Sequence, residues 1–415
     1  MLIKQFKKDY VPYLIGIIIP AIVSFVTIPV FKIVLGPSQF GIYTFYLSLL
    51  LIVNASFAGA ISQSIIRLHV DYVRKNTFYI ESVFFTLLIS SALALPLFTY
   101  IFFNYHFISF ALLFVVTLLV SNVYSSLLAI TQARLMSVNT AISESMRTII
   151  YLSLTLLLLH FFPTYSFLLL IFIALFSSYV IVCFFLLYKN QLSYSLNQIN
   201  ITDWWTTCKK ICNYGGYMVG WFFLCYAISM ANRFILAQHL GKENIGHFTA
   251  SFDMLNKSIA LLLSPVLISL FPLVVKAHAA GQFKQVKKLI RQLIILEGLL
   301  LAISLALYPF IGFPILNKLL QTPPTNEYLF LEMQVIAGTF IWQMALLQHK
   351  FLELKKRSKR MLLFVAISFA ISFSLDAILI PTNGVLLAGS GYLAGSIVYF
   401  LLTFYHKGEI DSTVF

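Results

Sequence analysis

Long runs of apolar residues, each separated from the next by a short polar stretch, cover almost the whole chain. Each run has about 20 or more residues, the length that an α-helix needs to cross the hydrocarbon core of a bilayer. The apolar positions are continuous and do not alternate with polar ones, which favours helices over a membrane barrel. The runs lie at about 12–35, 41–63, 79–102, 107–131, 142–162, 165–188, 211–237, 247–271, 290–313, 328–349, 361–380 and 385–405. We therefore expect an all-α polytopic membrane protein with twelve transmembrane helices.

Composition leads to the same class of protein. Of the 415 residues 60% are hydrophobic and only 10% are charged, so a soluble domain could not cover its apolar surface. The first run is longer than the core of a signal peptide and no small-residue cleavage site follows it, so we expect a retained helix. Cys208 and Cys212 are four residues apart without a second Cys or His pair nearby, and we expect packing residues here, with no metal site and no cofactor.

Basic residues gather in alternate connections between the runs. The two tails and the connections after runs 2, 4, 6, 8 and 10, with the adjoining ends of the runs, hold 23 of the 28 Lys and Arg residues. Such a bias places the basic side in the cytoplasm, so we expect both termini to be cytoplasmic, in a bacterial inner membrane. The net charge of +14 is explained by this topology and by contacts with membrane lipids, and we expect no nucleic-acid partner.

Two turns on the opposite side share one pattern. The turn after the first run and the turn after the seventh both read L-G-x-x-x-(apolar)-G-x-(aromatic)-T, offset by 205 residues. The first glycine of each can end a helix with a positive φ, and the second allows a tight return into the membrane. The glycines of the two turns are Gly36, Gly41, Gly241 and Gly246.

This repeat predicts two equivalent halves of six helices. Because six is even, both halves enter the membrane from the same side, and the repeat is parallel. We expect an N-terminal six-helix bundle at 1–188, a cytoplasmic linker at 189–210 and a C-terminal six-helix bundle at 211–415. Transporters of this kind bind substrate between their halves and rock them to alternate access.

Charged residues inside apolar runs, among them Lys32, Arg233, Asp253 and Lys257, each need a partner or a water-filled cavity. Arg233 is about 12 Å below the second repeated turn and Lys257 is about 16 Å deep, at 1.5 Å per residue. Asp253 precedes Lys257 by four residues, so the two could neutralise each other on one helix face. Arg233 could likewise be neutralised by a neighbouring acid. Lys32 could extend to the outer interface or face Arg233 across the halves.

Two further polar residues extend this set. Glu297 lies two turns inside the ninth run. It could be an interfacial residue, pair with Lys257 or toward Arg291, or carry a proton. Asn232 precedes Arg233. The excess of cations at depth would suit an anionic group such as a diphosphate, to which Arg binds through two parallel hydrogen bonds and Lys as a point charge.

The residues around the repeated turns resemble a known family. The stretch from Thr27 to Tyr43 is similar to the first-helix signature of Wzx-type O-antigen flippases, which belong to the multidrug/oligosaccharidyl-lipid/polysaccharide (MOP) exporter superfamily. Asn232-Arg233 followed by three apolar residues and by Gly241 and Gly246 resembles the Asp-Arg motif in the second half of that family. This chain has Asn232 where the family often has Asp, which puts proton coupling at this position in doubt and leaves Arg233 freer to meet an anion.

The resemblance implies a V-shaped, MATE-like fold and alternating access for an undecaprenyl-diphosphate-linked oligosaccharide, as in O-antigen and lipopolysaccharide biosynthesis. It implies a cavity lined by Arg233, Lys257, Lys32 and Asn232, charge-pair or coupling roles for Asp253 and Glu297, and work beside a polysaccharide polymerase and chain-length machinery. Coupling to H+ or Na+ stays open. We expect no enzyme and no catalytic residue, but two alternatives stand: a membrane polymerase or glycosyltransferase, and a drug/cation antiporter of the same superfamily.

Overall fold

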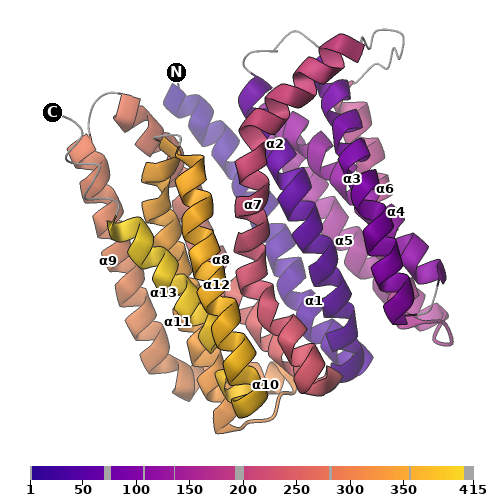
Figure 1. The fold of residues 1–415 in the computed structure, drawn as a ribbon, viewed down its shortest axis with the longest axis vertical. Helices are drawn as coiled ribbons and strands as arrows, with labels where there is room; N and C mark the ends of the chain where they lie inside the picture. Colours follow the sequence, from indigo (N-terminus) through magenta and orange to yellow (C-terminus); the bar gives the residue numbers. More distant parts are fainter. Residues whose placement is uncertain are drawn as a thin grey trace. The chain divides into compact units, whose positions relative to one another are not determined.

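The computed structural model describes residues 2–69, 76–105, 108–134, 136–191, 201–279, 283–354 and 357–405. Every secondary-structure element in these ranges is helical, and none of the described residues forms a strand (Figure 1). The first half consists of α1 (Leu2–Val53), η1 (Asn54–Ala58), α2 (Gly59–Leu68), α3 (Asn76–Tyr105), α4 (Ile108–Ala133), α5 (Ser137–Phe161) and α6 (Phe167–Asn190). The second half consists of α7 (Ile201–His239), α8 (Gly241–Ala279), α9 (Phe283–Leu307), η4 (Tyr308–Gly312), α10 (Phe313–Leu320), α11 (Asn326–Leu354), α12 (Ser358–Asn383), η5 (Gly384–Leu387) and α13 (Ser390–Tyr405).

Each of the twelve predicted spans coincides with a helix. Spans 1 and 2 form one helical segment, α1 followed by η1 and α2, which bends at the non-helical Gly36. Span 9 is longer than predicted, because α9 continues through the π-helical turn η4 into α10. The other helices match the predicted runs to within a few residues, apart from α7, which begins about ten residues earlier, and α8, which extends further at both ends.

The helices are long and apolar enough to cross a membrane. Among the described residues nine segments meet that standard, and one of them, Ile18–Leu68, has 51 residues, enough for two crossings at about 20 residues each. The long helix α8 and the shorter apolar helix α13 complete the twelve. Large apolar side chains such as Leu95, Phe184 and Phe310 are exposed on the helix surfaces, as expected where lipid is the solvent.

The contacts divide the chain into two compact units. The first unit contains Met1–Ser24 and Leu49–Phe223, and the second contains Phe25–Ser48 and Leu224–Phe415. These bounds differ from the predicted halves, because 25–48 packs with the second half and 211–223 packs with the first. The physical reason is that side chains in 25–48 bind partners in α7 and α8. Of the predicted linker 189–210, residues 192–200 lie outside the described residues, and α7 begins at Ile201.

The same packing pattern occurs in both units. In the first unit α4 packs against α2, α3 and α6, and α5 packs against α6. In the second unit α11 packs against α8, α9 and α13, and α12 packs against α13. When the helices are numbered as the twelve predicted spans, every pair of helices that packs together in the second unit corresponds to a pair in the first unit whose span numbers are lower by six. The parallel repeat predicted from the two turns is therefore present in the packing of the helices, with α4 and α11 as the equivalent central helices.

Candidate functional site

The two repeated turns lie against each other within the second unit. Gly36 and Gly241, the first glycines of the turns, both have positive φ, at 75° and 80°, as the pattern predicted. Gly41 is helical, and Gly246 makes the close approach: a Cβ atom on Gly246 would overlap the carbonyl oxygen of Pro37. Only a glycine lets the start of α8 approach the first turn this closely, so the repeat motif builds a contact between its own two copies.

Arg233 of α7 is held from both copies of the repeat. Its Nη1 donates to Ser48 Oγ at 2.6 Å, and its Nη2 donates to Asp253 in an ion pair. Ser48 and Asp253 are separated by 205 residues, so they occupy equivalent positions, each seven residues after the second glycine of its turn. The guanidinium carbon also lies 5.8 Å from the centre of the Phe252 ring. Arg233 is 2% exposed, so this cation is buried and neutralised.

These contacts decide between the alternatives left by the sequence. Asp253 and Lys257 form no ion pair, because Asp253 binds Arg233, although Asp253 still attracts Lys257 electrostatically. For Arg233, neutralisation by a neighbouring acid is the alternative observed, because Asp253 of α8 pairs with it, and the substitution of Asn232 does not leave the guanidinium free for an anion. Asn232 itself is fully buried, and its Nδ2 donates to the carbonyl oxygen of Ala388 at 3.1 Å. The amide thus binds backbone at the junction of η5 and α13, in contrast to the cavity role predicted for it.

Lys257 is the cation that stays available. Its side chain is exposed, one helical turn after Asp253 on α8. Within the described part of the chain it forms neither a hydrogen bond nor an ion pair. An ionised lysine near the middle of a span costs at least about 2.5 kcal/mol in lipid. Its exposed ammonium group is therefore expected to face water or a polar ligand.

Lys32 is 3% exposed, and its Nζ lies 2.8 Å from His247 Nδ1. It also interacts electrostatically with Glu332 of α11. Glu332 is fully buried and accepts hydrogen bonds from Ser251 and Tyr308, both at 2.6 Å. Lys32 therefore has its own partners, and the predicted arrangement in which it faces Arg233 gives way to a second charged cluster.

The sequence reasoning missed Ser48, His247, Tyr308 and Glu332. Two signals could have found them. Ser48 stands at the repeat offset from Asp253, and Glu332 is a carboxylate inside the tenth apolar run. His247 and Tyr308 carry no such signal, since their roles depend on which helices pack together.

Glu297 of α9 is buried at 2% exposure. Neither carboxylate oxygen has a hydrogen-bond partner among the described residues. The pairings considered for it, with Lys257 or with Arg291, do not form, and Arg291 is exposed. Glu297 thus stays separate from both charged clusters.

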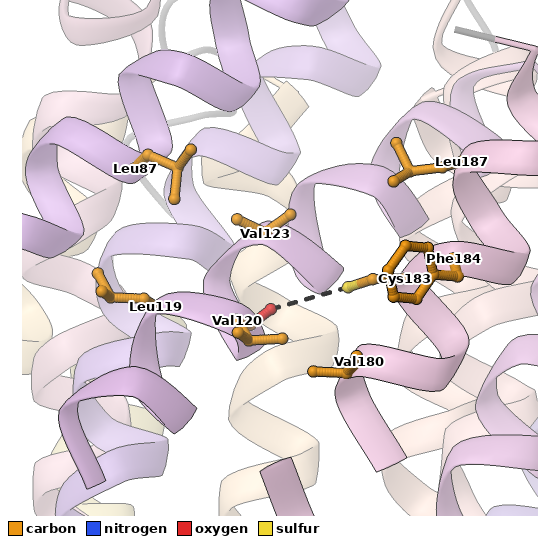
Figure 2. Close-up of a pocket in the computed structure, with 8 residues that line it drawn as sticks. All are labelled: Leu87, Leu119, Val120, Val123, Val180, Cys183, Phe184 and Leu187. Atoms are coloured by element: carbon orange, nitrogen blue, oxygen red, sulfur yellow. Dashed lines mark hydrogen bonds between the residues drawn. The ribbon is translucent and has the colours of Figure 1, made fainter. Parts of the chain in front are cut away.

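The first unit offers a different kind of surface. Figure 2 shows an apolar pocket of about 240 Å³ in this unit, where Cys183 Sγ lies 3.9 Å from the carbonyl oxygen of Val120. Its lining residues are all apolar or weakly polar: Leu87, Leu119, Val120, Val123, Val180, Cys183, Phe184 and Leu187. Such a pocket has no group that could bind a phosphate or a sugar hydroxyl, so the candidate site is the charged region of the second unit.

Among the described residues no cluster of three or more His, Cys, Asp or Glu side chains occurs, and this includes Cys208 and Cys212 near the start of α7. Cys208 is 3% exposed. Burial, with smaller contributions from Cys212 and Glu81, raises the pKa of Cys208 to about 11. The thiol is therefore neutral at physiological pH, as expected for a packing residue.

Comparison with known families and structures gives a consistent result. The family model described as polysaccharide biosynthesis protein matches residues 6–278. Among curated proteins, none matches the chain significantly.

Solved structures of transporters share the fold. A MOP superfamily transporter from Pyrococcus furiosus is similar with a TM-score of 0.71 and 12% identity, covering 99% of this chain and 96% of that one. The Vibrio cholerae MATE transporter VcmN is similar with a TM-score of 0.69 and 14% identity, covering 99% of this chain and 97% of that one. An outward-facing MATE family transporter of the MOP superfamily gives a TM-score of 0.70 at 10% identity, covering 97% and 94% of the two chains. At such identities the likeness establishes the fold alone.

Proposed function

Because this chain belongs to the family of polysaccharide biosynthesis proteins and has the MOP-superfamily fold, we propose that it is a flippase for a lipid-linked oligosaccharide. The substrate is an undecaprenyl-diphosphate-linked repeat unit, as in O-antigen or a similar polysaccharide. The protein carries it from the cytoplasmic to the outer leaflet of the bacterial inner membrane, with both termini in the cytoplasm. A polymerase would then use the translocated unit.

Lys257 is the observation that carries this proposal. Lys257 has no ion-pair partner among the described residues, and such a lysine deep in a span is a place where an anionic headgroup gains a charge-assisted contact and where lipid tails are excluded by the cost of the charge. One turn away, Asp253 and Arg233 form a neutral pair. Arg233, Asp253 and Lys257 together therefore carry one net positive charge, which suits one phosphate of a diphosphate and repels a cationic drug.

The mechanism follows from this placement. The diphosphate binds Lys257 in a water-accessible path, the sugars follow it through the path, and the polyprenyl tail stays in the lipid. Alternating access then exposes the headgroup on the outer side. Because Arg233 is already paired with Ser48 and Asp253, its first role is to hold α7, α8 and the second span together, and it serves the substrate as a positioning residue.

The test is translocation of a fluorescent lipid-linked oligosaccharide by the reconstituted protein. Lys257→Gln is expected to slow translocation at least about tenfold, since a charged hydrogen bond contributes about 1.5–3 kcal/mol and 1.4 kcal/mol is a factor of ten. Lys257→Arg keeps the charge and is expected to retain most activity. Lys287→Gln, at an exposed basic residue near the start of α9, is the matched control. Translocation at the wild-type rate by the Lys257→Gln variant would remove this lysine from the substrate path.

A drug/cation antiporter is the second candidate, favoured by the likeness to MATE transporters. It predicts efflux of a cationic dye that improves when Lys257 is neutralised, because the lysine would repel such a substrate. Dye efflux by the wild-type protein with no translocation of lipid-linked oligosaccharide would favour this alternative. A membrane polymerase is disfavoured, since both the family match and the fold belong to transporters.

A further inference from the structure

A line of titratable side chains leads from the surface into the second unit. It begins at Glu243, in the first turn of α8, whose side chain is 71% exposed. Glu243 Oε1 lies 3.8 Å from His247 Nε2, and the opposite ring nitrogen, Nδ1, lies 2.8 Å from Lys32 Nζ. His247 thus joins an exposed acid to a buried lysine through its two nitrogens.

The inner end of this line is the buried carboxylate of Glu332. It accepts one hydrogen bond from Ser251 on α8 and one from Tyr308. Tyr308 begins the π-helical turn η4, and its ring lies where a Cβ on Gly312 would overlap it. Turns of π-helix are frequent at functional sites because they redirect one side chain. Here the turn and the glycine together place the Tyr308 hydroxyl on Glu332.

The hydrogen-bond chemistry of this line depends on the protonation state of His247. An ammonium group can only donate, so the Lys32–His247 contact requires an unprotonated Nδ1 on the imidazole. The proton of the neutral ring is then on Nε2, facing Glu243. Uptake of a second proton at Nδ1 makes both ring nitrogens donors and places an imidazolium cation beside the Lys32 cation. Among the described residues, the groups that face His247 are Lys32, Glu243 and the ring of Tyr328, at 6.0 Å between centroids; Lys32 opposes the added charge and Glu243 favours it.

We propose that His247 is a proton-binding site whose protonation breaks the contact with Lys32 and so releases the outer part of span 1 from α8. The proton binds Nδ1 from water that enters as the Lys32 ammonium withdraws, and Glu243, beside Nε2, stabilises the imidazolium that results. Glu332 retains Lys32 when His247 lets it go, which makes the break reversible.

Two other contacts join these segments close to the released one. Pro37 packs on Gly246 one residue before His247, and Phe45 packs on Phe234 at 4.9 Å between ring centres. A protonated His247 therefore acts at the point where the two repeated turns meet. The role of this change as a step in transport rests on the proposed flippase function. The proton-linked structural change itself does not depend on that function.

The experiment measures a distance within the second unit as pH changes. Spin labels are placed at Ser38 and Gln238, both exposed, in a protein whose four cysteines are replaced by serine. Double electron–electron resonance is recorded from about pH 8 down to about pH 4, because burial and the adjacent Lys32 oppose protonation of His247 and move it below the usual range of histidine. We expect the wild-type distance distribution to gain a longer component as pH falls.

Two variants separate proton binding from packing. In His247→Asn the side-chain oxygen replaces Nδ1 as the acceptor for Lys32 but cannot bind a proton, so the short distance is expected at every pH. In Lys32→Gln the cation that opposes the added proton is absent, so the pH response is expected to be lost. Thermal unfolding of each variant confirms that it is folded.

The outcomes are distinct. A pH response in His247→Asn equal to that of the wild type would overturn the assignment of the proton to His247. A wild-type distance that does not change with pH would overturn the proposal as a whole. Because the measurement needs no substrate, its result is independent of the translocation assay: a clear pH response without oligosaccharide transport would contradict the flippase function and leave the proton site standing.

Discussion

The two units use polar side chains in opposite ways. In the described part of the first unit, a network of uncharged polar side chains joins the helices. Asn54 donates to Asn122 at 2.7 Å, and Asn122 donates to Ser90 at 2.6 Å. Thr86 and Ser126 lie 2.8 Å apart beside them. Such networks join neighbouring helices and contribute about 0.6–2 kcal/mol per bond in membranes.

In the second unit the polar residues at depth are charged, and several lack a complete set of partners. Lys32 and Arg233 are neutralised, Lys257 is exposed and unpaired among the described residues, and both oxygens of Glu297 lack a donor there. The charges of the first unit, such as Glu144 and Arg147, pair near the start of α5 instead. This difference is the reason why we propose the binding of an anion and of a proton in the second unit.

The largest expected effect is the loss of the buried ion pair. Arg233→Ala leaves Asp253 without its cation and Ser48 without its donor, and we expect unfolding to become easier by about 3 kcal/mol, since breaking a buried pair typically costs 3–5 kcal/mol and Asp253 is partly exposed. The measurement is chemical or thermal unfolding in detergent. Arg233→Ala/Asp253→Ala should recover part of the loss. With Asp253→Ala included to complete the cycle, losses that simply add would show that the two side chains do not stabilise each other.

A smaller effect is expected where the repeated turns meet. Gly246→Ala places a methyl group on the Pro37 carbonyl, and we expect a loss of about 1–3 kcal/mol from overpacking. Gly216→Ala in the first unit is the matched control, because a Cβ there meets no atom within 4 Å. That variant should be neutral or slightly stabilising, since alanine favours helix over glycine. If both variants unfold alike, the close contact between the turns is not a structural requirement.

The smallest of these effects is expected in the uncharged network. Asn122→Ala removes the partners of Asn54 and Ser90, and we expect a loss of about 1–2 kcal/mol, in line with hydrogen bonds between uncharged groups. Oligosaccharide translocation should stay at the wild-type rate, because the network is assigned to packing. A variant that is fully stable yet inactive would show that the uncharged network of the first unit serves transport and not packing.

Several features of the candidate site could be predicted from the sequence because they depend on local patterns. The cations Arg233, Lys257 and Lys32 stand out as charges in apolar runs, and the positive φ of Gly36 and Gly241 follows from the repeated turns. The partners could not be predicted in the same way. The i,i+4 spacing favoured Asp253 with Lys257, but Arg233 offers two parallel donors and a buried setting, and it outcompetes a lysine that can reach water.

The sequence by itself determined the class of the protein, its twelve spans and its parallel repeat, because membrane insertion depends on the apolar length and charge of each segment. The tertiary structure alone decided which unit each segment joins and which charge meets which partner. Residues 25–48 pack with the second half, since Lys32 and Ser48 bind residues on α7 and α8 that are about 200 positions away. A pairing over that distance depends on how helices pack, and no local pattern of residues encodes it.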